Sequence, residues 1–315
     1  MIWGSAGLNI LGIVPVGRVS IFLSMVIIVP FLILFVAAFS GHSISFAMPA
    51  PTLKGIEFSA LGMGLYTVMW NFLGWDNCTT YAGEVDKPVR SYLVSIAISF
   101  ATVMVLYILT VFITQNSGID FAKLSDEGFP ILGVKLGGQW LGTALSIGDM
   151  ASALGIFSAV MLSISRVPKV LADDNLLHPI FAKQHKRFST PYISILLYAT
   201  IVSFMVVWSF KELIVIDVIL YGAGLFLEFI SLIALRVKEP DAPRPFKIPL
   251  NVFLLCVMLL LPICIYSIAI TGVLTKSDAS NTPVYFAIGA LLTAELGWQV
   301  IKLNNKMKAK DVIES

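Results

Sequence analysis

Charged residues are scarce in this chain of 315 residues, and their scarcity excludes an ordinary soluble domain. Lys, Arg, Asp and Glu make up 13% of the sequence, whereas 57% of the residues are hydrophobic. Soluble globular proteins carry about 25% charged residues. The net charge of +2 says little about partners, because the placement of charge matters more than its sum in a membrane protein.

The sequence also lacks the motifs of redox, metal and nucleotide chemistry. Cys78, Cys256 and Cys264 all lie in apolar runs and form no CxxC pair, so we expect buried, reduced thiols. There is no GxxxxGK[ST] loop, no HExxH motif and no Gly-rich strand-to-helix turn. We therefore expect no metal, no cofactor and no nucleic-acid partner. An enzyme is a distant alternative, because no nucleophile is paired with a base.

Long apolar runs recur along the whole chain, and a run of about 20 residues is long enough for a helix to cross a bilayer. We expect an all-α, polytopic membrane protein with about eight spans. The expected spans are residues 19–39, 60–81, 92–114, 140–164, 192–207, 213–234, 250–270 and 284–301. They would form a single transmembrane domain over residues 1–315, ending in a charged cytoplasmic tail at 302–315.

The distribution of Lys and Arg among the loops supports this count of spans. Sixteen of the 21 basic residues fall on one side of the expected membrane and five on the other. The five are Lys54, Lys123, Lys135, Lys211 and Lys276. Because basic loops face the cytoplasm, we expect both ends of the chain on the cytoplasmic side of the plasma membrane.

The loop at residues 166–191 is notable for a basic cluster formed by Lys183, Lys186 and Arg187. Such a cluster attracts anionic lipid headgroups, although the general bias of basic residues toward the cytoplasm also accounts for it. The same loop carries a helical pattern at 167–174.

The second expected span contains polar groups that are unusual at membrane depth. Asn71, Asp76 and Asn77 lie in its middle, beside Gly74. An ionisable group there costs roughly 2.5–3.5 kcal/mol, so it normally faces a cavity, a substrate or a partner charge. A backbone opened near Gly74 would present N–H and C=O groups to a solute, as in many secondary transporters. We predict that this span is a broken helix and forms half of a substrate site.

Carboxylates and aromatic rings in the expected spans suit an amine as the solute. An ammonium group in hydrocarbon needs a counter-charge, which Asp76 would supply. Trp70, Trp75 and Tyr221 would contact an alkylammonium through cation–π interactions. Glu228 lies two turns after Tyr221 in the sixth span. The alternative is that the aromatic residues mark the membrane interfaces.

A carboxylate surrounded by hydrocarbon also takes up a proton readily, because a low dielectric favours its neutral form. The candidates for coupling transport to protons are Asp76, Glu84, Asp149 and Glu228. Structural roles stay open for all four, and Glu84 in particular has Lys87 and Arg90 nearby as ion-pair partners. Asp217 and Glu295 lie nearer the ends of their spans, where we expect an interfacial, structural role.

Several motifs resemble those of the amino acid–polyamine–organocation transporters. Ala82-Gly83-Glu84-Val85 followed by Pro88 is similar to the end of that family's sixth helix. Residues 165–191 and 236–249 resemble its loops after the eighth and tenth helices. The resemblance implies the inverted-repeat fold of the bacterial leucine transporter. This chain would supply helices five to twelve of that fold, and the family's first four helices are absent from it.

Three details resemble the polyamine branch of this family. Asn71 with Trp75-Asp76 matches an NxxxWD pattern, Tyr221 to Phe229 matches YxxGxxxEF, and Pro30-Phe31 matches the fifth helix. The likeness implies that amine groups contact Asn71, Asp76, Tyr221 and Glu228. The full set of expected substrate-binding residues is Trp70, Asn71, Gly74, Trp75, Asp76, Asn77, Tyr221 and Glu228. The fifth-helix lysine of many proton-coupled amino-acid members is missing from residues 19–39, which leaves the proton carrier open.

The expected function is secondary active transport of polyamines or amino acids by alternating access, driven by a proton or other cation gradient. Polyamines are favoured over amino acids. The expected partners are therefore a small amine or amino acid and the lipid bilayer. The missing helices favour an alternative, which is a truncated, inactive permease fragment or a non-transporting sensor or regulatory subunit.

Overall fold

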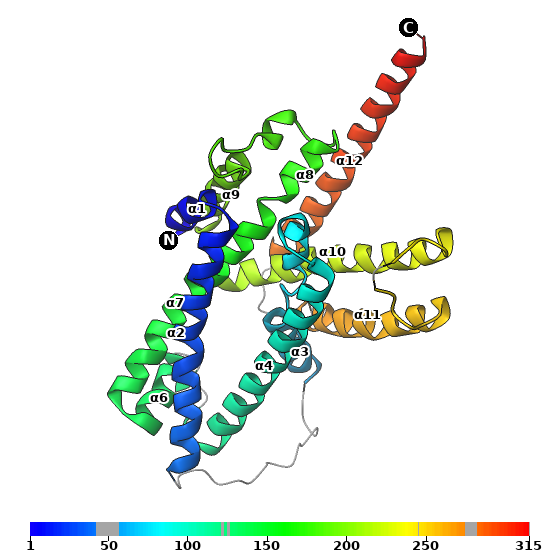
Figure 1. Ribbon diagram of the computed structural model, residues 1–315. Helices are drawn as coiled ribbons and strands as arrows, with labels where there is room; N and C mark the ends of the chain where they lie inside the picture. Colours follow the sequence, from blue (N-terminus) through cyan, green and yellow to red (C-terminus); the bar gives the residue numbers. More distant parts are fainter. Residues whose placement is uncertain (42–56, 121–122, 125–126, 245, 275–281, 315) are drawn as a thin grey trace. The chain divides into compact units, whose positions relative to one another are not determined.

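The computed structural model describes residues 1–41, 57–120, 123–124, 127–244, 246–274 and 282–314, and this part of the chain is all-helical (Figure 1). The helices are α1 (Ile2–Ile10), α2 (Ile13–Ser40), α3 (Phe58–Asn71), η1 (Asn77–Glu84), α4 (Pro88–Asn116), α6 (Pro130–Gly137), α7 (Gln139–Ile164), α8 (Val167–Asp173), η2 (Pro179–Ala182), α9 (Tyr192–Met205), α10 (Phe210–Lys238), α11 (Val252–Leu274) and α12 (Thr282–Glu314). The predicted all-α class is confirmed.

All eight expected spans correspond to helical segments, but they differ in kind. Among the described residues, six helices are long and apolar enough to cross a membrane, namely α2, α4, α7 with α8, α10, α11 and α12. The fifth expected span is the shorter helix α9, whose 14 residues extend about 21 Å. The second expected span is interrupted between α3 and η1. Lys54 and Lys276, which enter the topology prediction, lie outside the described residues.

The chain divides into two compact units. Unit 1 comprises Met1–Pro51 and Gly74–Phe204, and unit 2 comprises Thr52–Leu73 and Met205–Ser315. Unit 1 thus holds α1, α2, η1, α4 and α6–α9, and unit 2 holds α3 and α10–α12. The single transmembrane domain expected over 1–315 stays a prediction. Helix α12 continues through most of the expected tail, as far as Glu314.

Unit 1 is built around α2 and α7, which pack against each other along their length (Figure 1). Leu34 of α2 and Leu141 and Leu145 of α7 are fully buried there, together with Ile113 of α4 and Leu132 of α6. These apolar residues have no polar group to satisfy, so the helices pack through side-chain shape alone. The α2–α7 pair therefore forms the core against which α4 and α6 pack.

Helix α1, which we did not predict, packs on α7 and α9 in the same unit. Ala6 contacts Met161 and Ile195 in a second apolar cluster. The amide nitrogen of the buried Asn9 side chain donates to the carbonyl and hydroxyl oxygens of Ser158, both at 3.2 Å. A nine-residue helix is too short to show a clear hydrophobic period, and so its pattern did not reveal it.

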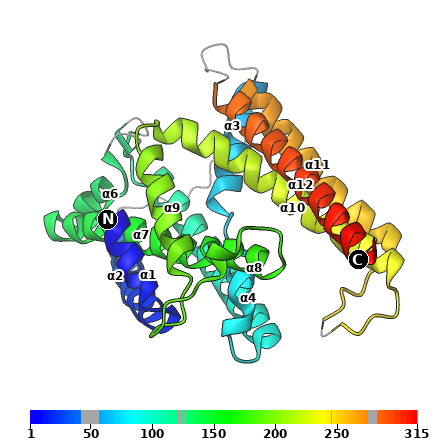
Figure 2. The ribbon, with the colours of Figure 1, turned by 90° about the horizontal axis from the view of Figure 1, so that it is seen from above.

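Unit 2 is a layer of α10, α11 and α12 with α3 packed on α11 and α10 (Figure 2). Helices α3 and α11 touch through two glycines, because a Cβ on Gly62 would lie 2.5 Å from the Cα of Gly272. Helix α10 starts with a capping box in which Ser209 accepts from the Glu212 N–H, and the Glu212 carboxylate accepts from Ser209. Tyr66, Val218 and Tyr266 form the apolar core.

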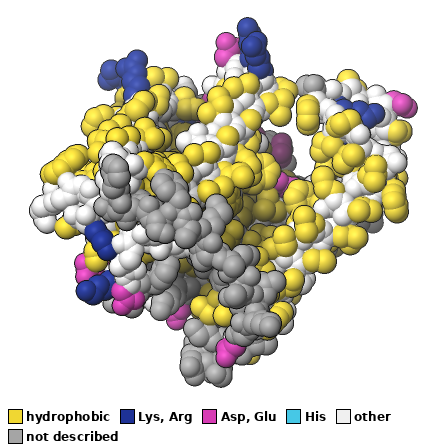
Figure 3. All heavy atoms as spheres, turned by 90° about the horizontal axis from the view of Figure 1, so that it is seen from below, with side chains coloured by type: hydrophobic (Ala, Val, Ile, Leu, Met, Phe, Trp, Pro, Cys, Tyr) yellow, Lys and Arg dark blue, Asp and Glu magenta, His cyan; other side chains and the backbone are white. Residues whose placement is uncertain are grey.

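The surface of the helices is largely apolar. Figure 3 shows hydrophobic side chains over broad areas, with charged side chains in small groups. Phe204, Leu227 and Phe253 are 75%, 64% and 72% exposed, for example. Such areas are far larger than the patches tolerated on soluble monomers, and they fit a multi-pass membrane protein.

Candidate functional site

The predicted break in the second span is present. Helix α3 ends at Asn71, residues 72–76 form turns, and a 3-10 helix, η1, starts at Asn77. Gly74 has φ of +98°, a left-handed conformation that side chains with a Cβ rarely adopt. The prediction of a broken helix is therefore confirmed, with the interruption centred on Gly74.

The chain after the break is stabilised by its own short polar side chains. The Thr79 hydroxyl donates to the Asp76 carbonyl at 2.7 Å, and the Cys78 thiol donates to the Trp75 carbonyl at 3.2 Å. The Thr79 N–H also donates to the Asp76 carbonyl, at 2.8 Å. These bonds replace the α-helical ladder, so the segment keeps a defined shape although it is not an α-helix.

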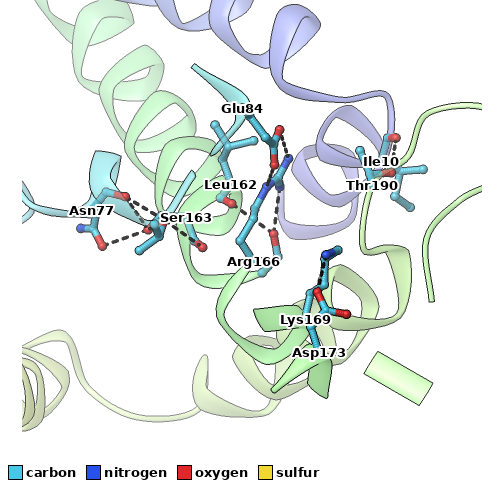
Figure 4. A network of polar contacts seen from close by, with 11 residues as sticks. Ile10, Asn77, Glu84, Leu162, Ser163, Arg166, Lys169, Asp173 and Thr190 are labelled. Atoms are coloured by element: carbon cyan, nitrogen blue, oxygen red, sulfur yellow. Dashed lines mark hydrogen bonds and ion pairs between the residues drawn. The ribbon is translucent and has the colours of Figure 1, made fainter. Parts of the chain in front are cut away.

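Helix η1 is tied to the last turn of α7 by a cluster of neutral oxygens (Figure 4). The hydroxyl of Ser163 donates to the backbone carbonyl of Asn77 at 2.9 Å, and its oxygen lies 3.2 Å from the Asn77 side-chain oxygen. The hydroxyl oxygens of Ser163 and Thr80 are 2.9 Å apart. The Ser163 residue is only 1% exposed, so these bonds are shielded from water. Asn77, predicted to bind substrate, is thus in contact with α7.

The far end of η1 is held by an ion pair to Arg166, which lies between α7 and α8 (Figure 4). The Arg166 guanidinium donates from Nε and Nη2 to the two carboxylate oxygens of Glu84, at 3.0 and 3.4 Å. Its Nη1 donates to the Ser165 hydroxyl at 3.1 Å, and Arg166 is 4% exposed. The partner of Glu84 is therefore Arg166, which lies 82 residues away, and not Lys87 or Arg90 as expected.

In unit 2, the end of α3 is held against the first half of α10. The Tyr66 hydroxyl donates to the carbonyl of Ile214, and the Trp70 indole donates to the Asp217 carboxylate. Asp217 lies one turn before Tyr221 on α10, on the same side of the helix. Asp217 thus contacts a predicted site residue, and its expected interfacial, structural role stays a prediction.

The eight predicted substrate-binding residues fall into two groups. Gly74, Trp75, Asp76 and Asn77 belong to unit 1, and Trp70, Asn71, Tyr221 and Glu228 belong to unit 2. Tyr221, Gly224 and Glu228 do share a face of the unbroken helix α10, as the motif implied. Asn71 donates from its side chain to the Thr67 carbonyl at 2.8 Å, which closes the last turn of α3.

The predicted proton-coupling residues occupy different environments. Glu84 is ion-paired with Arg166. Asp149 is exposed on α7, and 14 residues separate it from Ser163, which is about 21 Å along the helix. Asp149 therefore lies well away from the oxygen cluster around Ser163. The coupling role of all four candidates stays a prediction.

Sequence reasoning missed four residues that position the segment around the break: Thr80, Ser163, Arg166 and Asp217. A signal for two of them was present, because Ser163 and Arg166 are three residues apart at the end of an apolar helix. For Asp217 the signal was its four-residue spacing from Tyr221. The described residues contain no group of three or more His, Cys, Asp or Glu side chains able to hold a metal ion.

The described residues form six membrane-length apolar helices, and the shorter helix α3 is interrupted beside a carboxylate. This combination is typical of a polytopic membrane protein of the transporter type. The family model described as "Amino acid permease" matches residues 1–293. The chain belongs to this family, whose members are membrane transporters and not enzymes.

Curated relatives carry transporter names. The chain is 32% identical over 255 residues to "Polyamine transporter RMV1" of Arabidopsis thaliana, covering 79% of this chain and 51% of the relative. It is 32% identical over 259 residues to "Polyamine transporter PUT1" of Oryza sativa subsp. japonica, covering 81% and 47%. It is 26% identical over 203 residues to "Branched-chain amino acid permease BcaP" of Bacillus subtilis (strain 168), covering 62% and 42%. The chain spans about half the length of the curated relatives it matches.

Proposed function

We propose that this protein is a secondary active transporter of small amines, with polyamines favoured over amino acids. The observation that carries the proposal is the break at Gly74, which is followed directly by Trp75 and Asp76. A carboxylate beside an interrupted backbone costs free energy in a membrane, and recognition of a cationic solute offsets that cost. The polyamine transporters among the relatives support this choice of substrate.

Each predicted binding residue has a chemical role in this proposal. Asp76 neutralises an ammonium group of the solute, and Glu228 is a second carboxylate able to neutralise an ammonium group. Trp70, Trp75 and Tyr221 pack on the methylene chain and contribute cation–π attraction of about 0.5–2 kcal/mol each. The remaining hydrogen bonds come from the side chains of Asn71 and Asn77 and from the backbone at Gly74.

Alternating access moves the bound amine across the plasma membrane, with a proton or other cation gradient as the energy source. No cofactor takes part. Candidates for the proton carrier are Asp76, Glu84, Asp149 and Glu228. In the proposed orientation, the side that bears sixteen of the 21 basic residues faces the cytoplasm, together with both ends of the chain.

Uptake of labelled spermidine tests this function, in cells that express the gene and lack their own polyamine uptake. We expect uptake that a protonophore abolishes, and that Asp76→Asn lowers by a factor on the order of ten or more, because one buried charge loses its partner. Asp86→Asn is the matched control, since Asp86 lies exposed in the turn between η1 and α4, and uptake should be unchanged.

Labelled leucine in the same cells separates the substrate classes. Leucine uptake without spermidine uptake would reverse the choice of substrate in favour of amino acids. If the protein is present in the membrane but neither solute enters, the transport proposal fails, and a non-transporting role takes its place.

A further inference from the structure

A second feature of unit 1, the loop from Lys183 to Thr190 between η2 and α9, has an ordered backbone. The N–H of His185 donates to the Thr190 carbonyl at 2.8 Å, and the N–H of Ser189 donates to the His185 carbonyl at 2.9 Å. The Nδ1 atom of His185 accepts from the N–H groups of Arg187 and Phe188, at 3.2 and 3.4 Å. The imidazole ring also stacks on Phe188, with centroids 4.9 Å apart. These contacts fix the tip of the loop.

The loop is anchored to the corner between α1 and α2. The hydroxyl of Thr190, a residue only 3% exposed, donates to the Ile10 carbonyl at 2.8 Å (Figure 4). Helix α1 in turn packs against α7 and α9 through the cluster that contains Ala6 and Ile195. The basic tip is therefore held on a packed part of the protein and is not a free connection.

The charge on this loop is uncompensated. Lys183, Lys186 and Arg187 are exposed, and the sequence has no Asp or Glu from residue 175 to residue 211 or from residue 1 to residue 56. Within the described part of the chain, no salt bridge joins these three side chains to an acid. The nearest acids along the chain, Asp173 and Asp174, end α8, and Asp173 is already paired with Lys169 at 2.6 Å. The three exposed cations thus have no acidic partner among the described residues, and the Arg187 guanidinium lies over the Phe188 ring, 5.4 Å from its centroid.

The place of the basic loop directly before α9 indicates how deep its three cations would lie in a membrane. Helix α9 begins at Tyr192, five residues after Arg187, and no charged residue occurs within it. Exposed apolar side chains lie close by in the sequence, at Leu177 and Ile180. A basic cluster directly before an apolar helix, with aromatic rings at the boundary, lies at the level of lipid phosphates.

We propose that Lys183, Lys186 and Arg187 form a binding site for the phosphate of an anionic phospholipid. The three cations lie within five residues of one ordered and anchored loop, whereas a general excess of basic residues in cytoplasmic loops requires no defined arrangement. The bound lipid stabilises the corner where the loop, α1 and α9 meet.

Thermal unfolding of the full chain in lipid nanodiscs tests the proposal, with discs of phosphatidylcholine alone or containing phosphatidylglycerol. Retention of phosphatidylglycerol is measured in parallel by native mass spectrometry. We expect phosphatidylglycerol to raise the unfolding temperature and to be retained selectively. The triple variant Lys183→Gln/Lys186→Gln/Arg187→Gln should weaken lipid retention by roughly fivefold per basic side chain, and so on the order of 100-fold in all.

The matched control removes three exposed basic residues elsewhere, as Lys238→Gln/Lys247→Gln/Lys302→Gln, and should retain the lipid like the unmodified protein. Equal loss in both triple variants would overturn the proposal in favour of a general charge effect. A lack of preference for phosphatidylglycerol in the unmodified protein would also overturn it. Because that second readout needs no substitution, the test holds even if the triple variant fails to fold.

Discussion

The two halves of the interrupted span differ in the contact that dominates their attachment, although α3 also donates hydrogen bonds from Tyr66 and Trp70 to α10. Helix α3, before the break, is fixed in unit 2 by close backbone approach to α11 at Gly62 and Gly272. Helix η1, after the break, is fixed in unit 1 by polar contacts to Ser163 of α7 and to Arg166, which follows α7. Backbone packing depends on shape and has no alternative partner, whereas hydrogen bonds and ion pairs exchange with water or solute. We therefore expect α3 to be the more permanent attachment and η1 the more exchangeable one.

The largest loss of folding stability is expected from a larger side chain at the contact between α3 and α11. Gly62→Leu places a side chain where the α11 backbone lies, and overpacking of this kind costs about 3 kcal/mol of folding free energy. Unfolding temperature and membrane yield measure the loss. Gly64→Leu is the matched control, because nothing lies within 4 Å of a Cβ at Gly64. Equal damage from both variants would mean that the glycine contact has no special role.

A smaller loss of folding stability is expected when the ion pair between Glu84 and Arg166 is broken. Glu84→Gln removes the partner of a guanidinium that is only 4% exposed, and should cost about 1–2 kcal/mol, because the Glu84 side chain is 41% exposed and partly screened by water. Thermal unfolding of Glu84→Gln, Arg166→Gln and the double variant measures the coupling. If the two single losses add up in the double variant, the ion pair does not hold η1 to the corner between α7 and α8.

The smallest effect is expected at the oxygen cluster. Ser163→Ala removes the hydroxyl that joins Asn77 to Thr80 and should cost about 1 kcal/mol, as for one net hydrogen bond. Ser146→Ala, on the same helix, is the control, since the Ser146 hydroxyl bonds only within α7, to the Gly142 carbonyl. If Ser163→Ala is as stable as this control, the hydrogen bonds of Ser163 do not help to hold η1 to α7.

The break was predictable from the sequence, because Gly74 and three polar residues interrupt an otherwise apolar run. That the fifth expected span is shorter than the others was also visible in the sequence. The attachments of the two halves were not predictable, since they depend on pairs far apart in the chain, such as Glu84 with Arg166 and Gly62 with Gly272. No local pattern encodes which helices become neighbours. For the same reason Asp217, judged by its depth alone, was not linked to Trp70.

The central claim is that the chain opens at residues 72–76 to receive a polar solute. Single cysteines at Phe72 or Leu73, in a protein with Cys78, Cys256 and Cys264 replaced by serine, test it by reaction with a water-soluble thiol reagent in membranes. The account predicts rapid labelling at these positions that spermidine slows, and no protection by spermidine at Val68→Cys on α3. Labelling no faster than in the lipid-facing helices, with or without spermidine, would contradict it.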